Sequence, residues 1–300
     1  MREEVLSSAT EELLKLDPSL PATGPEGPRR RWIPFSGWHF FLLPFALFML
    51  MPLLWTVTTA LELPSQAGTF PPKLIPQPVT FGNFSRAWSL APMARWFANT
   101  VVQTGTIVLV DLVLASLAAY AFARIRFRGR EVLFFVFLTT LMVPFQLTVI
   151  PTFIITKNLG LVDSLGGLIV PNLGSVFGIF LLRQFFRSLP IELEEAATID
   201  GASRLGVLLK IVLPLSVPAL VTLALLELLN YWNDFFWSLI IINTPNSMPL
   251  QLGLSTFSTA HTTNFSLLTA ATVMTQLPLV LAFLFAQRYF VRSVAFSGLK

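Results

Sequence analysis

Residues Glu195–Gly201, which read Glu-Ala-Ala-Thr-Ile-Asp-Gly, lie at the centre of a polar stretch in a chain that is otherwise mostly apolar. The polar stretch covers about 187–214. The segments on either side of it are apolar enough to be membrane spans. A polar stretch between two spans lies in water, where it can bind another protein. The fold therefore depends on the number of spans and on the side of the membrane that this stretch faces.

The polar stretch predicts two short helices joined by a turn. Glu192, Glu194 and Glu195 place negative charge in the first turn of the first helix, where the helix dipole favours it. Gly201 can take the left-handed conformation that ends a helix, and Ser203 can cap the next one. The apolar residues that follow repeat at the spacing of one helical face. We therefore expect two amphipathic helices that present a compact surface to water.

The composition is that of a protein with several membrane spans. Hydrophobic residues make up 54% of the chain, charged residues only 12%, and there are 28 Phe. The chain has no Cys, which excludes disulfides, thiol catalysis and Cys-ligated metals. The two histidines, His39 and His261, are far apart and have no metal-ligand spacing. We therefore expect no metal site.

Six apolar segments are expected to cross the membrane as helices, which gives an all-α integral membrane protein. Each segment is about as long as the helix needed to cross a hydrocarbon core about 30 Å thick. Pro144 is expected to kink the third segment, and Pro171, Asn172 and Gly174 interrupt the fourth. The six segments cover about 38–60, 99–123, 132–153, 165–182, 215–233 and 267–286, and the fifth can extend to 242.

The remaining segments are expected to lie outside the membrane. The first domain, 1–31, is a mixed-charge, proline-containing tail that we expect to be cytoplasmic and disordered, apart from one short helix at 11–16. The second domain, 32–300, holds the six spans. Within it, 61–97 is expected to be an extracytoplasmic loop, because its proline motifs block regular helix.

The basic residues indicate the orientation. A net charge of +4 and four arginines in 124–130 would suggest nucleic acid in a soluble protein, but between two spans they are a topology signal. The tail, 124–130, the polar stretch together with the nearby Arg183, and the C-terminus hold all but four of the 20 Lys and Arg residues. The positive-inside rule then places both termini and the polar stretch in the cytoplasm. We expect lipid, and no nucleic acid, as a partner.

Several polar side chains lie within the spans. Glu227, Asn230, Tyr231 and Asp234 recur at helical spacing on one face, and Asp111 lies in the middle of the second span. Such a stripe faces the inside of a bundle. It can line a translocation path for a polyhydroxyl solute or clamp helices together. Alternatively, Tyr231, Trp232 and Trp237 can anchor this segment at the membrane interface. For Asp111, a structural hydrogen bond is favoured over contact with a substrate. The candidate path residues are Asp111, Glu227, Asn230, Asn233 and Asp234.

Small residues recur every four positions near the end of the second span, at Ala115, Ala119 and Ala123. In a membrane, where no hydrophobic force drives helices together, such a stripe lets a second helix approach closely. We expect close packing here, although alanine is also a common helix former.

The spacing from Glu195 to Pro214 resembles the EAA loop in membrane subunits of ATP-binding-cassette importers. The pattern is Glu-Ala-Ala, three residues, Gly, nine residues, Ile, one residue, Leu-Pro, and every fixed position is met. In that family the loop is the coupling helix that sits in a groove of the cytoplasmic ATPase. An interfacial helix on lipid head groups is the alternative. The resemblance implies ATPase coupling by Glu194, Glu195, Ala196, Ala197, Asp200 and Gly201.

The resemblance extends to sugar-importer permeases of the maltose type and covers roughly 81–300. The first thirty or so residues have no counterpart, and Ser293 stands where many relatives have Gly. The matching segments are 99–100, 117–129, 178–186, 189–190, 232–235 and 287–292.

The resemblance implies a non-catalytic permease subunit of a binding-protein-dependent importer for a sugar or oligosaccharide. It also implies that this chain has no catalytic residue and binds no cofactor of its own. It implies a prokaryotic cell (inner) membrane, a second permease subunit, a pair of ABC ATPase subunits that bind ATP and Mg, and an extracytoplasmic sugar-binding protein. The chain has no Gly-x-x-x-x-Gly-Lys-Ser/Thr phosphate loop, so we do not expect it to hydrolyse ATP. The uncharged loop 243–264 resembles the one that reaches toward the binding protein.

Three alternatives remain open. A secondary transporter or channel for a small polar solute would also have six spans, but it does not need the EAA spacing. An importer permease for a polyol phosphate, such as glycerol phosphate, would share the whole pattern. An intramembrane enzyme would need a convergent catalytic set, for which Asp111, Glu227 and Asp234 are candidates, and no His, Cys or metal motif accompanies them.

Overall fold

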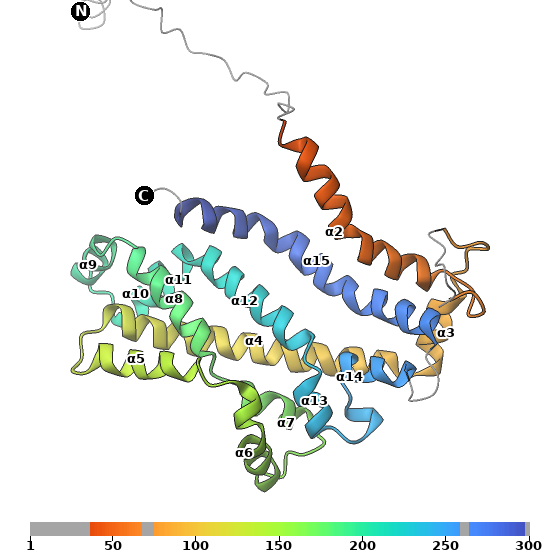
Figure 1. Ribbon diagram of the computed structural model, residues 1–300. Coiled ribbons are helices and arrows are strands. Elements are labelled where there is room, and N and C mark those ends of the chain that lie inside the picture. The colour runs from red at the N-terminus through yellow and green to blue at the C-terminus, as the bar shows by residue number, and fades with distance from the viewer. Residues whose placement is uncertain (1–36, 68–74, 259–263, 298–300) are drawn as a thin grey trace, which may run out of the picture. The chain divides into compact units, whose positions relative to one another are not determined.

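The computed structural model describes residues 37–67, 75–258 and 264–297, and this part of the chain is helical, without a β-strand (Figure 1). The predicted tail 1–31 and its short helix lie outside these residues. The chain forms two units, 1–51 and 52–300. The first holds the start of helix α2, and the second holds the rest of α2 and the other helices that the structure describes.

Three helices are each long and apolar enough to cross a membrane: α2 (His39–Ala60), α4 (Met93–Arg124) and α15 (Phe265–Ser297). Up to six crossings result if each of three bent helix pairs forms one span. The bent pairs bend by 95°, 44° and 78°, in chain order. Their parts are α5 (Arg130–Thr140) with α6 (Phe145–Asn158), α7 (Leu165–Ile169) and η1 (Val170–Asn172) with α8 (Val176–Ser188), and α10 (Arg204–Val207), η2 (Leu208–Val212) and α11 (Leu213–Leu215) with α12 (Val217–Trp232).

The breaks occur where the sequence carries helix-breaking residues. Pro144 immediately precedes α6, and the 95° bend lies at the turn before it. The kink expected at Pro144 is therefore present, but it is a full break rather than a bend in one helix. In the fourth span, the helix resumes as α8 after the break. Ser175 caps the start of α8 by accepting a hydrogen bond from the backbone N–H of Gly178. Ser216 separates α11 from α12.

Short helices fill the connections between the spans. One of them, α3 (Gly82–Leu90), together with the start of α4, lies in the segment that was expected to lack regular helix. The reason is local, because the segment after Pro78 contains no proline until Pro92. The other short elements are α9 (Glu192–Ile199), α13 (Phe236–Ile241), η3 (Pro245–Ser247), α14 (Leu250–Leu254) and η4 (Ser255–Phe257).

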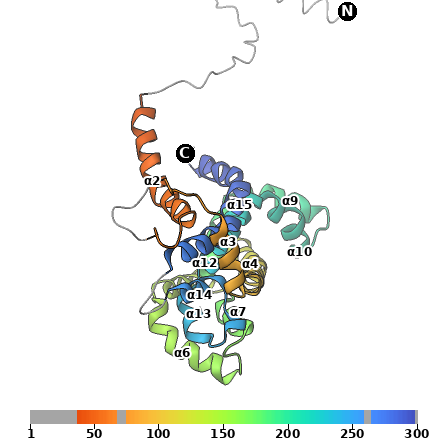
Figure 2. The same cartoon turned by 90° about the vertical axis from the view of Figure 1, so that its right-hand side faces the viewer.

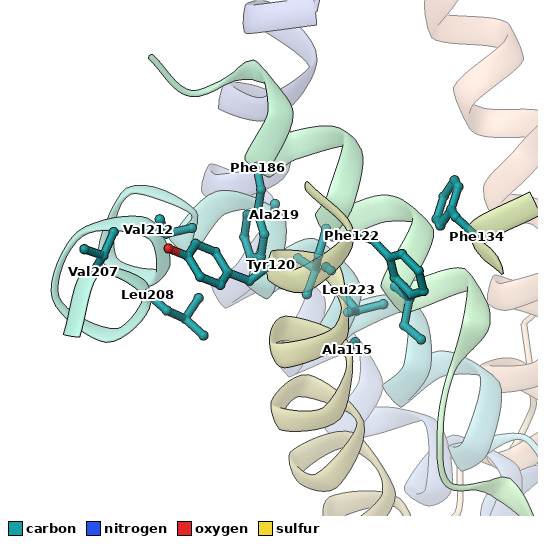
Figure 3. Packing of buried hydrophobic residues seen from close by; sticks show 13 residues of the cluster. Ala115, Tyr120, Phe122, Phe134, Phe186, Val207, Leu208, Val212, Ala219 and Leu223 are labelled. Atoms are coloured by element: carbon teal, nitrogen blue, oxygen red, sulfur yellow. The ribbon is translucent and has the colours of Figure 1, made fainter. Parts of the chain in front are cut away.

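Helix α4 lies at the centre of the second unit, where it packs against α7, α8, α12 and α14 (Figure 1 and Figure 2). A Cβ atom added at Gly178 of α8 would lie 3.2 Å from the Cβ of Ala115. Both Ala115 and Ala119 are buried there, which confirms the close packing predicted from the alanine stripe. Figure 3 shows that this core continues from Ala115 and Leu223 to Val207 and the polar stretch.

Candidate functional site

The polar stretch folds into two short helices with a tight turn between them. Helix α9 carries its acidic residues in the first turn, as expected. Gly201 follows with φ +86°, a left-handed conformation that a residue with a side chain rarely adopts. Ser203 then caps α10 by accepting a hydrogen bond from the backbone N–H of Gly206, at 3.2 Å. The chain continues through the π-helical segment η2 into α11.

A buried ion pair fastens α9 to the end of α4. Nε of Arg124 lies 2.7 Å from a carboxylate oxygen of Glu194, and both side chains are almost fully buried. The hydroxyl of Tyr120 donates to the other carboxylate oxygen, at 3.3 Å. Arg124 also donates to the backbone carbonyls of Phe186 and Leu189, each at 2.7 Å. One guanidinium thus joins the end of α4 to the end of α8 and to α9.

The opposite face of α9 is exposed. Glu195, Ala196, Asp200 and Gly201 are open to solvent, and Ala197 is half-buried. Ile199 is also there, with 87% of its surface exposed. Leu193 of the same helix is exposed as well, and exposed apolar groups rimmed by polar residues mark sites of interaction with other proteins or with a membrane. We refer to the exposed residues Leu193, Glu195, Ala196, Ile199, Asp200 and Gly201 as the α9 surface.

A second buried arginine, Arg183 of α8, was missed by the sequence reasoning. One of its terminal nitrogens donates to both carboxylate oxygens of Glu131, and Nε donates to the carbonyl of Phe122 at 3.1 Å. Its guanidinium carbon also lies 3.9 Å from the centre of the Phe134 ring. The sequence signal for this contact is a lone arginine within an apolar run. A charged side chain in a span needs a partner, so this arginine indicates a buried ion pair.

Three of the polar residues expected in the spans meet at the break between η1 and α8. The backbone N–H of Gly174 donates to Asp111 at 2.6 Å, so Asp111 has the structural hydrogen bond that was favoured for it. Glu227 of α12 is buried and lies beside Asp111 and Ser175. The hydroxyl of Tyr231 donates to the carbonyl of Asn172 at 3.2 Å.

The other residues of the predicted stripe lie elsewhere. Asn230 is exposed, and α12 ends at Trp232, so the helix does not continue through Asp234. Asp234 instead accepts a hydrogen bond from the hydroxyl of Ser238, at 3.0 Å, at the start of α13. Asn233 accepts one from the side chain of Gln251, also at 3.0 Å. The face that sequence spacing predicts is therefore interrupted after Tyr231.

The opposite end of α4 holds the loop before α14. Four side chains in the first turns of α4, Arg95, Trp96, Asn99 and Thr100, bond the backbone of 245–250. The bonds are Arg95 Nε to Asn246 O (3.1 Å), Trp96 Nε1 to Pro245 O (2.8 Å), Asn99 Nδ2 to Asn246 O (2.9 Å) and Met248 O (2.8 Å), and Leu250 N to Thr100 Oγ1 (2.8 Å).

Asp163 holds the same loop from another side. Its Oδ1 accepts hydrogen bonds from the backbone N–H groups of Asn243 and Thr244, at 2.9 and 3.0 Å. The backbone N–H of Thr244, followed by that of Asn243 and the Thr244 hydroxyl, lowers the pKa of Asp163 below its usual value despite partial desolvation. The hydroxyl of Ser247 donates to the backbone carbonyl of Asp163, at 3.1 Å. The loop is therefore fixed on two sides.

No three His, Asp or Glu side chains lie close enough together to hold a metal ion in the ranges that the structure describes.

Comparisons with known proteins agree with the pattern of the polar stretch. A family profile described as "Binding-protein-dependent transport system inner membrane component" matches residues 111–296. The arabinooligosaccharides transport system permease protein AraQ of Halalkalibacterium halodurans is 36% identical over 75% of this chain and 81% of its own length. The sn-glycerol-3-phosphate transport system permease protein UgpE of Yersinia pestis bv. Antiqua is 34% identical, over 86% and 95%.

Among solved structures, a chain of a bacterial ABC transporter involved in the import of the acidic polysaccharide alginate superposes with a TM-score of 0.75. It is 28% identical in sequence, and the match covers 84% of this chain and 94% of that one.

Proposed function

Because the chain belongs to the family of binding-protein-dependent transport system inner membrane components, we propose that it is the permease subunit of an ATP-driven importer for a sugar or oligosaccharide. The transport of arabinooligosaccharides by one relative and of alginate by a structural neighbour supports this substrate class. Membership of the family removes the secondary transporter and the channel as alternatives. The similarity to UgpE keeps a polyol phosphate as the second candidate substrate.

The observation that carries the proposal is the α9 surface. It combines the protruding Ile199 with Glu195 and the Gly201 turn, and the buried Arg124–Glu194 pair gives it a fixed position. In this proposal the α9 surface contacts a cytoplasmic ATPase subunit. Glu194 is buried and holds α9 in place through its ion pair with Arg124, and Ala197 packs against the hydrophobic core on the inner side of α9.

The proposed orientation places both termini and α9 in the cytoplasm of a prokaryotic cell, with the chain in its inner membrane. The concentration of Lys and Arg on that side supports it. The partners are a second permease subunit, a pair of ATPase subunits that bind ATP and Mg, and an extracytoplasmic binding protein that delivers the solute. The chemical step, ATP hydrolysis, belongs to the ATPase subunits.

Within the spans, Asp111 and Glu227 border the proposed translocation path, because they lie together at a helix break where backbone groups are freed from helical hydrogen bonds. Asn230, Asn233 and Asp234 lie outside this group, and they would meet the solute only toward the end of α12.

The test is co-purification of the chain with the products of its neighbouring genes, followed by ATPase assays in lipid nanodiscs. Recovery of an ATPase whose activity rises with one sugar-loaded binding protein is the expected result. A folded chain that retains no ATPase would overturn the proposal. Stimulation by a binding protein loaded with glycerol phosphate, but with no sugar, would favour the polyol phosphate importer.

Two variants locate the contact. Ile199→Asp and Gly201→Asp should release the ATPase subunit, because the first places a charge in an apolar contact and the second strains the turn. Ser188→Asp is the matched control, since it introduces the same charge at an exposed position at the end of α8. If both α9 variants retain the ATPase and its activity as the control does, the α9 surface is not the contact.

A further inference from the structure

Helix α4 differs from the other helices that are long enough to span a bilayer. It contains 32 residues, which is about 48 Å of helix. Proline is absent from α4, whereas α2 contains Pro44 and Pro52 and α15 contains Pro278. The remaining candidate spans in the described part of the chain are bent pairs. Because sharp kinks arise mainly at proline and at helix breaks, α4 is the stiffest element that could connect the two sides of the membrane.

Both ends of α4 are fastened by side chains of α4 itself. At one end, Arg124 and Tyr120 hold the Glu194 carboxylate of α9. At the other end, Asn99 and Thr100 bond the backbone just before and at the start of α14. These contacts are buried or partly buried, so water competes with them less than it does at an exposed site.

The fastened segments also have little freedom to move independently of α4. The loop 245–250 is bonded by four α4 side chains, and the adjoining 243–244 are bonded by Asp163. Asp163 lies in the turn before α7, which itself packs against α4. Helix α9 has a single buried side chain, Glu194, and that side chain pairs with α4. A shift of α4 along or about its axis therefore carries both segments with it.

We propose that α4 transmits a conformational signal between the loop 245–250 and the coupling helix α9 through the side chains bonded at its two ends. This inference rests on the proposed function, in which α9 contacts the ATPase and the binding protein acts from the opposite side. Asn99, Thr100, Tyr120 and Arg124 are then positioning residues: they touch neither the solute nor ATP, and they set how binding on one side changes hydrolysis on the other.

The test uses the complete complex in nanodiscs and measures ATP hydrolysis against the concentration of loaded binding protein. Asn99→Ala removes two hydrogen bonds to the loop, and Thr100→Val removes one with little change in shape. Each should lower the maximal stimulation by about fivefold or more, the lower range of allosteric coupling, and leave the basal rate unchanged. The half-saturating concentration of binding protein should also stay unchanged, because docking itself is intact.

The control is Val102→Ala, which shortens an exposed side chain of the same helix turn and should keep full stimulation. Tyr120→Phe weakens the attachment at the other end, because it removes the hydroxyl that donates to Glu194, and it should lower stimulation in the same way. Because both changes interrupt one route, the double variant Asn99→Ala/Tyr120→Phe should lose no more than the more severe single variant.

Three results would overturn the inference. The first is stimulation retained within about twofold in both Asn99→Ala and Thr100→Val, because that change is well below the range of allosteric coupling. The second is a fall of the basal and stimulated rates in equal proportion, which would indicate a structural role only, and the third is a change in the half-saturating concentration alone, which would make the loop a docking contact. A wild-type complex without any ATPase is a separate result, which refutes the proposed function itself.

Discussion

One terminal nitrogen of Arg183 lies 2.8 and 2.7 Å from the two carboxylate oxygens of Glu131, so a single guanidinium joins α8 to the first turn of α5. The same side chain donates to the Phe122 carbonyl of α4. Three helices therefore depend on one charged group, and it is positioned at the end of the bundle that also carries α9.

Arg183→Ala should destabilise the protein because it leaves the Phe122 carbonyl without its donor. A buried acceptor that loses its partner costs about 1–3 kcal/mol. Thermal unfolding of the purified chain in detergent measures the effect, and Arg187→Ala, an exposed arginine on the same helix, serves as the control. An equal unfolding midpoint for the two variants would show that Arg183 holds nothing together.

Asp111→Asn should keep both stability and transport close to wild type, because the side-chain carbonyl can still accept from Gly174 N–H. Asp111→Ala should lose about 0.5–1.5 kcal/mol, the net contribution of a typical hydrogen bond, since the Gly174 N–H then loses its side-chain acceptor. Unfolding midpoints and solute uptake are the measurements. Loss of uptake by Asp111→Asn with unchanged stability would contradict the structural role and indicate contact with the solute.

Gly253→Ala should destabilise the packing of α14 on α4, because the added Cβ would overlap the ring of Trp96. Overpacking of this kind costs about 1–3 kcal/mol. The matched control is Gly105→Ala, where an added Cβ has no neighbour within 4 Å and alanine favours the helix by up to about 1 kcal/mol. The two variants should move the unfolding midpoint in opposite directions, and a shared direction would contradict the close contact.

Asp163 should make stability depend on acid pH. Its pKa is lower in the folded protein than in the unfolded chain, so its contribution is complete above the unfolded value of about 4 and is lost as the pH falls through the folded value. Because the group is accessible to solvent, we expect no more than about 1 kcal/mol. Asp163→Asn, which tolerates the left-handed φ of 58°, should flatten the decline between about pH 5 and pH 3. Parallel curves for the two proteins would exclude this role.

The spans and the polar stretch could be predicted because their signals are local. The length of an apolar run indicates a membrane span. Gly201 indicates the end of a helix because glycine takes the left-handed conformation easily, and Ser203 indicates the start of a helix because its side chain can cap one. The resemblance at 195–214 depended on spacing alone, and the family profile that covers it confirmed the family.

The contacts that fix α9 could not be predicted from such signals. Arg124 and Glu194 are far apart in the sequence, and no periodicity joins them; Arg124 was counted only as a topology signal. The stripe that ends in Asp234 failed for a different reason. Helical spacing gives a common face only while the helix continues, and α12 ends at Trp232.

The exposure of Ile199 has a consequence for the life of the chain in the cell. In the proposed assembly, a copy that has been inserted in the membrane but has not yet bound its ATPase subunit displays this side chain, 87% exposed, to the aqueous phase. Proteases and chaperones of quality control recognise exposed apolar surface, and assembly would hide it. We therefore expect unpartnered copies to be short-lived, so that the abundance of the subunit follows that of the protein that covers α9.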